Sequence, residues 1–200
     1  MPSSHTRQSA SFVKNAWRPG LASRITCARG CISESVLKII PTGQDHVPST
    51  EQQAHAVAVF RAMVPYGAIE AKVYDDLEFI DQGQYCEAVM CSSCSTRVAV
   101  TPFGGTDLAQ DWYHDFVAAI VARTTPILEF ETTMPCCGAS VSLTSLRFDM
   151  PAGIARFELC ATDPHVEGDV KGGATTLSAE QLDKLEAVLG CKLKQIEARY

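Results

Sequence analysis

Two pairs of cysteines stand out as residues that could do chemistry. Cys91 and Cys94 form a C-x-x-C motif in "YCEAVMCSSCSTRVAV", and Cys136 and Cys137 are adjacent in "TTMPCCGASVSL". Paired thiols suit either a redox reaction or the binding of a soft metal ion. A redox pair of the thioredoxin kind needs a helix to begin at the motif, because the helix dipole stabilises the attacking thiolate.

The residues after the first pair do not predict a helix. "STRVAVTPFGG" alternates apolar and polar positions and then breaks at proline and glycine, which is typical of a strand that enters a turn. The second pair follows "ILEFE", for which a strand is also predicted, and precedes a glycine. The sequence therefore favours a metal ion over redox chemistry, and buried free thiols are the remaining alternative.

The stretches "MCSSCS" and "MPCCGA" resemble the two knuckles of zinc-ribbon proteins. The resemblance covers only the knuckles and the strands beside them, and it implies a structural zinc ion and no reaction. In such a site four thiolates surround the ion at ~2.3 Å, with no bound water. The stretch "PCCGASVSLTSLRF…PAGIARFEL" is also similar to uncharacterised bacterial proteins that carry a ribbon of this kind.

The second knuckle departs from the ribbon pattern Cys-Pro-x-Cys-Gly, because Met134 stands where the first cysteine is expected. Either Cys136 substitutes, so that adjacent residues share one ion, or Cys137 binds alone with Cys86 or His114 as the fourth ligand. Our expectation is a single zinc ion held by the two pairs, that is by Cys91, Cys94, Cys136 and Cys137.

Other groups could support catalysis. "QDWYHDF" places Asp111, His114 and Asp115 on or near one face of a predicted helix, where positions three apart are neighbours. His46 and His165 lie in two loops, "GQDHVPST" and "DPHVEGDVKGG", which a pseudo-symmetric fold would bring to the same end of the sheet. Solvated side chains and simple connecting loops are the favoured interpretation of both groups.

The remaining candidates are expected to be structural. An acidic run could bind a hard cation, and it consists of Asp75, Asp76, Glu78 and Asp81. The run lacks the glycine of a calcium-binding loop, so we expect a solvent-exposed acidic edge. Four further cysteines have no partner motif, and they are Cys27, Cys31, Cys160 and Cys191.

The elements that must hold these residues form two similar units. In the first, a strand over 36–40 precedes a helix over 50–64, which begins at a capping box of Ser49 and Gln52, and a strand over 69–73 follows.

In the second unit, a strand over 157–161 precedes a helix over 179–189, and a final strand covers 196–200. This helix has its own capping box, Ser178 and Gln181, and Gly190 stands at the position of a C-terminal cap.

Two βαβ units predict an α+β fold, a ferredoxin-like split βαβ arrangement with a zinc-ribbon-like insertion at about 82–150. The insertion contains a helix of its own, capped by Thr106 or Asp107. Its expected buried face consists of Leu108, Trp112, Phe116, Ala119 and Ile120.

Charge divides the chain. Residues 1–33 carry five basic side chains and no acid, which leaves 12 Lys and Arg against 23 Asp and Glu in the rest, a net charge of −11. We expect residues 1–35 to be a disordered or loosely attached basic arm, a transit peptide or an upstream extension, and 36–200 to form one domain. A domain with this much negative charge is not expected to bind nucleic acid.

No run approaches the ~18 apolar residues of a membrane span, and cysteines without a secretory signal indicate a reducing, cytoplasmic setting.

These observations favour a zinc-stabilised, non-catalytic α/β module that binds another macromolecule, with a basic protein as the expected partner. A small enzyme is the first alternative, with its site on the helix of Asp111 and His114 or in the two loops after the first strand of each unit. Nucleic-acid binding through the ribbon is the second alternative, although Arg97 is the only basic residue close to either knuckle.

Overall fold

A computed structural model describes residues 34–65, 67–102, 104–164 and 176–200. The basic arm up to residue 33, with Cys27 and Cys31, lies outside the described residues, as does His165. No helix in the described part of the chain is long and apolar enough to cross a membrane.

Four strands form the main sheet, in the order β2-β8-β1-β9, and every pair of neighbours is antiparallel. They are β1 (Ser35–Pro41), β2 (Ala68–Ile80), β8 (Gly153–Thr162) and β9 (Leu193–Arg199). Helix α1 (Thr50–Met63) connects β1 to β2, and α3 (Ala179–Leu189) connects β8 to β9. Each helix therefore joins two strands that are separated by one other strand.

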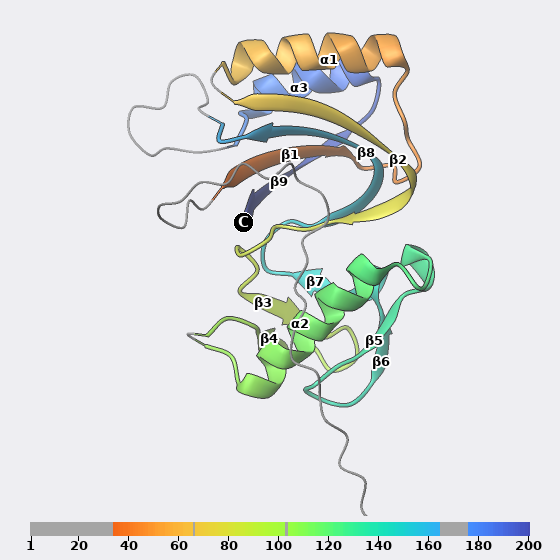
Figure 1. Ribbon diagram of the computed structural model, residues 1–200, viewed down its shortest axis with the longest axis vertical. Helices are drawn as coiled ribbons and strands as arrows, with labels where there is room; N and C mark the ends of the chain where they lie inside the picture. The colour runs from red at the N-terminus through yellow and green to blue at the C-terminus, as the bar shows by residue number, and fades with distance from the viewer. Residues whose placement is uncertain (1–33, 66, 103, 165–175) are drawn as a thin grey trace, which may run out of the picture. The chain divides into compact units, whose positions relative to one another are not determined.

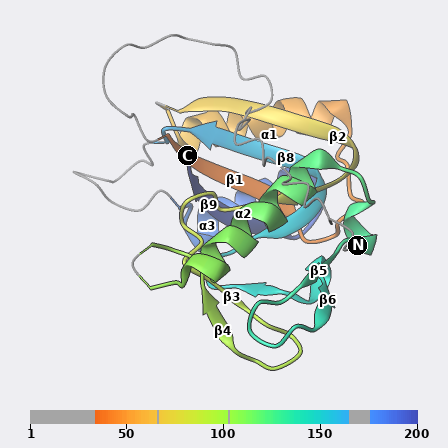
Figure 2. The same cartoon turned by 60° about the horizontal axis from the view of Figure 1, so that its bottom comes forward.

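The two helices lie side by side on one face of the sheet (Figures 1 and 2). The chain is of the α+β class, as the sequence predicts.

Local sequence explains where the two helices begin and end. Both capping boxes are present. The hydroxyls of Ser49 and Ser178 accept hydrogen bonds from the backbone amides of Gln52 and Gln181, and the side-chain oxygens of these glutamines accept from the serine amides. Helix α3 ends at Gly190, whose φ of +71° suits a residue without a side chain. The helices start and stop within one residue of the predicted bounds.

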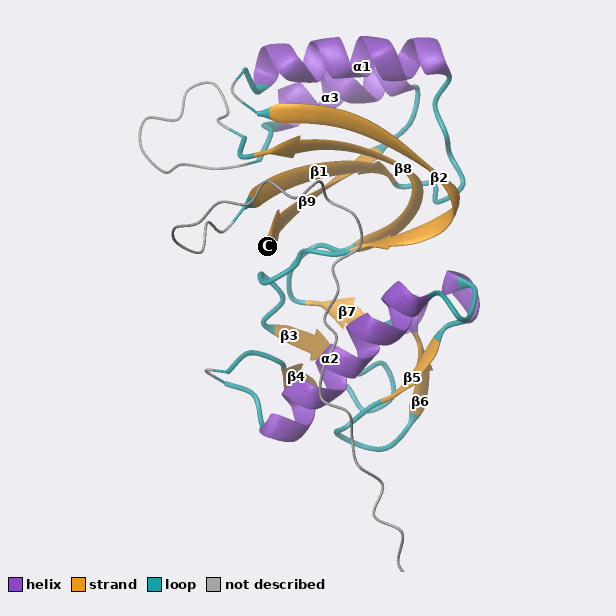
Figure 3. Ribbon diagram, viewed as in Figure 1, coloured by secondary structure: helices purple, strands orange, loops and turns teal. Residues whose placement is uncertain are grey.

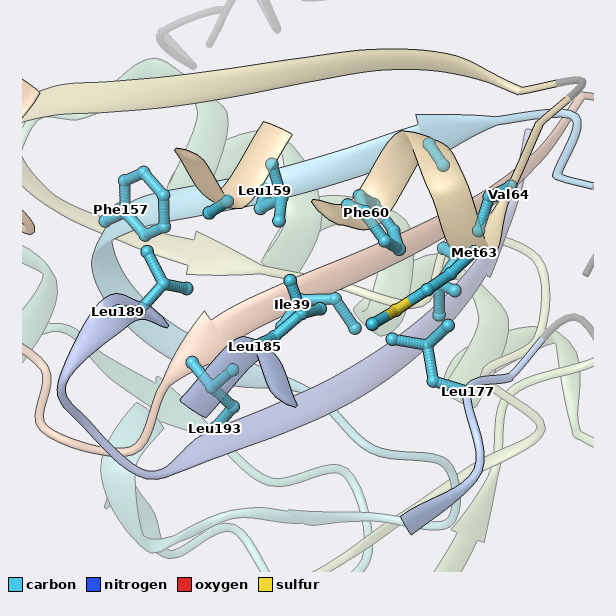
Figure 4. Close-up of a cluster of buried hydrophobic side chains, with 13 residues drawn as sticks. Ile39, Phe60, Met63, Val64, Phe157, Leu159, Leu177, Leu185, Leu189 and Leu193 are labelled. Atoms are coloured by element: carbon cyan, nitrogen blue, oxygen red, sulfur yellow. The ribbon is translucent and has the colours of Figure 1, made fainter. Parts of the chain in front are cut away.

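The core of this part lies between the helices and the sheet (Figure 4). Phe60 of α1 and Leu185 of α3 are fully buried and meet Ile39 and Leu159 of the central strands. Burial of each such side chain contributes about 2 kcal/mol. Successive side chains of a strand point to opposite faces of the sheet, so every second residue of β1 and β8 points toward the helices and contributes to this core.

Short elements fill the segment between β2 and β8 (Figure 3). They are β3 (Ala88–Met90), β4 (Arg97–Ala99), α2 (Asp107–Ala122), the 3-10 turn η1 (Ile127–Glu129), β5 (Glu131–Thr133), β6 (Ser140–Ser142), the 3-10 turn η2 (Leu143–Ser145) and β7 (Arg147–Phe148). β3 pairs with β4 and β7, and β5 pairs with β6, in both cases antiparallel.

A second hydrophobic cluster stabilises this segment and links it to the sheet. Phe116 of α2 is its central buried ring, and it contacts Phe79 of β2, with ring centres 6.4 Å apart, and Phe130, at 5.8 Å. An ion pair of 2.7 Å between Arg123 and Glu78 joins the end of α2 to the same strand.

Three details differ from the prediction. Leu108 of α2 is 66% exposed while Ala109 is buried, so the helix is rotated relative to the expected face. The predicted strand "ILEFE" begins as the turn η1, because Ile127 and Phe130 both turn inward to pack on the second cluster. β2 extends to Ile80 because its pairing with β8 resumes after a register shift between Val73 and Glu78.

Candidate metal centre

The first cysteine pair sits in the turn between β3 and β4. The amide of Cys91 donates to the carbonyl of Thr96 at 3.0 Å, and the amide of Ser95 donates to the carbonyl of Cys91 at 2.9 Å. Ser95 adopts a φ of +58° to close this turn. The turn is followed by a strand, so no helix dipole acts on Cys91 or Cys94.

The second pair sits in an equivalent turn between β5 and β6. The amide of Met134 donates to the carbonyl of Ala139 at 2.9 Å, and the amide of Gly138 donates to the carbonyl of Met134 at 2.9 Å. Gly138 has a φ of +72°, the counterpart of Ser95. Met134 therefore corresponds to Cys91, and Cys137 corresponds to Cys94. Cys136 lies at a position that has no ligand in the first turn.

The two turns bring four sulfur atoms together. Their Sγ atoms all lie within 4.8 Å of one another. The distance is 3.7 Å from Cys91 to Cys137, 3.5 Å from Cys94 to Cys136, and 3.9 Å from Cys136 to Cys137. In a tetrahedron with metal–sulfur bonds of ~2.3 Å, the sulfurs are about 3.8 Å apart. All four thiols are free, so the cluster has the dimensions of a metal site and not of a disulfide.

The cluster lies at the surface with one buried member. Cys91 is buried against the second hydrophobic cluster, while Cys94, Cys136 and Cys137 are exposed. Met134 is fully buried beside Cys91 in that cluster. The position that would carry a ligand in a regular knuckle is therefore used for packing.

The polar surroundings of the sulfurs favour one thiolate at neutral pH. The hydroxyl and the amide of Thr96, together with the neighbouring thiol of Cys136, lower the pKa of Cys94 to about 6. The Thr96 hydroxyl oxygen lies 3.2 Å from its sulfur. Desolvation and the sulfurs of Cys94 and Cys91 raise the pKa of Cys136 to about 12. Four thiolates so close together need a cation to balance their charge.

The alternative fourth ligands lie elsewhere. Cys86 is buried, its Sγ is 3.8 Å from the carbonyl of Ala88, and burial raises its pKa to about 11. His114 is exposed on α2. Neither belongs to the sulfur cluster, which is the single group of three or more metal-binding side chains found in the described residues.

The residues considered for catalysis are not assembled into a site. Asp111, His114 and Asp115 are all exposed on α2. The ring of His46 instead lies 3.3 Å from the carbonyl of Leu189, at the end of α3, where it caps the helix together with Gln52.

The acidic run and the remaining described cysteines are also dispersed. Asp75 and Asp76 are exposed, Glu78 pairs with Arg123, and Asp81 accepts hydrogen bonds from the amide of Gly83 and from a tyrosine hydroxyl. Cys160 is buried in the main sheet and Cys191 is half-buried after α3.

A group of polar residues that the sequence did not single out lies on the sheet face opposite the helices. The hydroxyl of Tyr74 donates to the buried carboxylate of Glu158 at 2.9 Å. On the same face, buried Lys38 donates to the hydroxyl of Tyr200 and to the carbonyl of Asp81. Only the charged residues at alternate positions of β1 and β8 hinted at this group, and their pairing depends on the order of the strands.

Comparison with known proteins adds no relative. No model of a protein family matches the chain, and searches of curated proteins and of solved structures found no match either.

Proposed function

We propose that Cys91, Cys94, Cys136 and Cys137 hold one zinc ion, and that the ion is structural. The observation that supports this proposal is the cluster of four Sγ atoms within 4.8 Å, with nearest pairs between 3.5 and 3.9 Å. Four thiolates fill a tetrahedral zinc site, so no position is left for a reactive water. The ion would supply the positive charge and the cross-link that these two surface turns require.

Zinc in this position would stabilise the segment between β2 and β8. The three-residue strands on either side of the turns are too short to be stable alone. Because the unfolded chain offers no preformed site, ligation and folding of the segment would be coupled.

Elemental analysis of the purified full-length chain tests the metal. We expect one zinc ion per chain after exhaustive buffer exchange, and four additional reactive thiols once a chelator removes it. Protein that is metal-free but fully folded, or a disulfide between Cys91 and Cys94 under reducing conditions, would contradict the proposal.

We further propose that the domain is a non-catalytic module that binds a protein with a basic surface. The net charge of −11 on residues 34–200 supports a basic partner. The exposed side of α2 combines carboxylates, Asp111 and Asp115, with two large apolar side chains, Leu108 at 66% and Val121 at 68% exposure. Apolar side chains among charges of one sign suit a protein interface better than a phosphate backbone.

Affinity capture from a native lysate with matched variants tests this second proposal. We expect Leu108→Lys combined with Asp111→Lys to lose the captured protein, while Glu180→Lys on the exposed surface of α3 retains it. Equal capture by both variants, or capture that a nuclease abolishes, would argue against a protein interface on α2.

We also propose that the main sheet and its two helices form a ferredoxin-like split βαβ unit, in a protein of the reducing cytoplasm. The order β2-β8-β1-β9 with antiparallel neighbours, and helices that each bridge one intervening strand, support the fold relationship. The free thiols of the described cysteines support the reducing compartment.

A further inference from the structure

The four sulfur ligands of the proposed zinc site are not equivalent. Cys91, Cys94 and Cys137 occupy regular positions of the two turns, whereas Cys136 replaces the ligand that Met134 does not provide. Cys136 therefore reaches the cluster from a turn position that carries no ligand in the first turn, one residue before Cys137.

The sulfurs also differ in how they are shielded. The Cys94 thiol donates to the Thr96 hydroxyl at 3.2 Å; as a zinc-bound thiolate it would instead accept from that hydroxyl and from the Thr96 amide, and Cys137 would accept from the amide of Ala139. Such bonds draw electron density from a thiolate and lower its nucleophilicity. Within the described part of the chain, the hydrogen-bonding neighbours of the Cys136 sulfur are all sulfurs, those of Cys94, Cys137 and Cys91. Cys136 is exposed as well.

We propose that this site responds to peroxide: Cys136 is oxidised first, Cys94 then forms a disulfide with it, and the zinc ion is released. The proposal rests on zinc being bound as argued above. Solvent access, thiolate character and a neighbouring second thiol are the features of redox-sensitive cysteines. Cys136 is exposed, bound zinc would hold it as a thiolate, and the sulfur of Cys94 lies 3.5 Å away.

The oxidant is hydrogen peroxide, and the electrons balance in two steps. The Cys136 thiolate attacks one peroxide oxygen, so that an S–O bond forms, the O–O bond breaks and hydroxide leaves. The Cys94 thiolate then attacks the Cys136 sulfur, so that the S–S bond forms and the second hydroxide leaves. The two sulfurs lose two electrons, each hydroxide takes a proton to become water, and zinc remains Zn²⁺ throughout. Two thiolates are then too few to retain the ion.

The geometry selects Cys94 as the partner of Cys136. A bond between Cys136 and Cys137 would join adjacent residues, whose Cα atoms are ~3.8 Å apart, below the ~4.4–6.8 Å that a relaxed disulfide spans. Cys91 is only 2% exposed and packs in the second hydrophobic cluster, so its movement toward Cys136 would disturb the core.

The experiment treats the zinc-loaded, reduced full chain with hydrogen peroxide. Zinc release is followed with a chromogenic chelator, lost thiols are counted, and a tryptic digest is analysed by mass spectrometry. Cleavage after Lys72, Arg97, Arg123 and Arg147 separates the first cysteine pair from the second. We expect two thiols lost per zinc released, a disulfide between Cys94 and Cys136 that links the two peptides, and recovery of the site with a reductant and zinc.

A double variant, Met134→Cys with Cys136→Ser, is the matched control. It restores the regular ligand position and removes the unshielded thiol, so we expect it to bind zinc and to retain it under the peroxide treatment that empties the wild type. Release from the double variant at the wild-type rate would overturn the inference, as would a disulfide within either pair. Zinc in the native protein that peroxide does not release would contradict this inference alone, whereas native protein without zinc would refute the metal site itself.

Discussion

The hydroxyl of Tyr74 donates a hydrogen bond of 2.9 Å to the carboxylate of Glu158, which is only 3% exposed. The two residues lie on neighbouring strands, β2 and β8, on the face of the sheet that α1 and α3 do not cover. Burial and then the nearby Glu158 raise the pKa of Tyr74, so the hydroxyl remains a neutral donor throughout the physiological range. Lys72 is a more distant partner, at 3.9 Å from the same carboxylate.

Replacement of Tyr74 by phenylalanine should therefore destabilise the sheet. Loss of a hydrogen bond to a buried carboxylate costs about 2 kcal/mol, and urea unfolding of Tyr74→Phe would measure it. Tyr85→Phe is the control, because the hydrogen bonds recorded for Tyr85 involve its backbone. Equal stability of the two variants would show that Glu158 finds another donor.

Removal of one metal ligand should empty the proposed site and loosen the segment that it stabilises. For Cys94→Ser or Cys137→Ser we expect loss of zinc and faster amide exchange over residues 85–150, while the amides of β1 and β8 stay protected in part. Cys191→Ser is the matched control outside the cluster. A ligand variant that keeps one zinc ion per chain would contradict the four-cysteine assignment.

Phe116 should be the most sensitive position of the second hydrophobic cluster. It is 2% exposed and makes edge-to-face contacts with rings from β2 and from the chain before β5. Phe116→Ala should cost about 3–5 kcal/mol through lost burial and a cavity. Val121→Ala on the same helix, at 68% exposure, should change the free energy of unfolding by less than about 0.5 kcal/mol. Thermal unfolding of both variants makes the comparison.

Gly83 should tolerate alanine less well than Gly190. Both have a positive φ, +57° and +71°, which costs a non-glycine residue about 1 kcal/mol. A Cβ atom at Gly83 would also overlap the carbonyl oxygen of Arg199, whereas at Gly190 it would meet only the flexible end of Gln52 at 3.3 Å. We expect Gly83→Ala to lower the melting temperature clearly more than Gly190→Ala.

The parts of the structure that the sequence predicts are those that local chemistry decides. The capping boxes at Ser49 and Ser178 fix the starts of two helices, and alternation fixes the inward face of β1 and β8. The spacing of cysteines and the turn signals after them predicted that two distant pairs belong together.

Other features depend on contacts between segments that are far apart in the chain. Leu108 was expected to face inward, but Ala109 packs in the second hydrophobic cluster in its place and Leu108 is exposed. The bond between Tyr74 and Glu158 exists only because β2 lies beside β8. No local pattern distinguishes Cys136 from Cys86 as the fourth member of the cluster, because that choice follows from how the second turn closes.

The order of strands in the main sheet also bears on how the chain is made. β1 pairs with β8 and β9, and β2 pairs with β8, so among the described residues neither of the first two strands has a partner strand synthesised before β8 begins at Gly153. Both cysteine pairs, α2 and the short strands from β3 to β7 are complete by Phe148. On the ribosome, the cysteine-rich segment thus has all its internal contacts available while the sheet has none of its pairings. β1 gains its first partner only with β8 and its second only with β9.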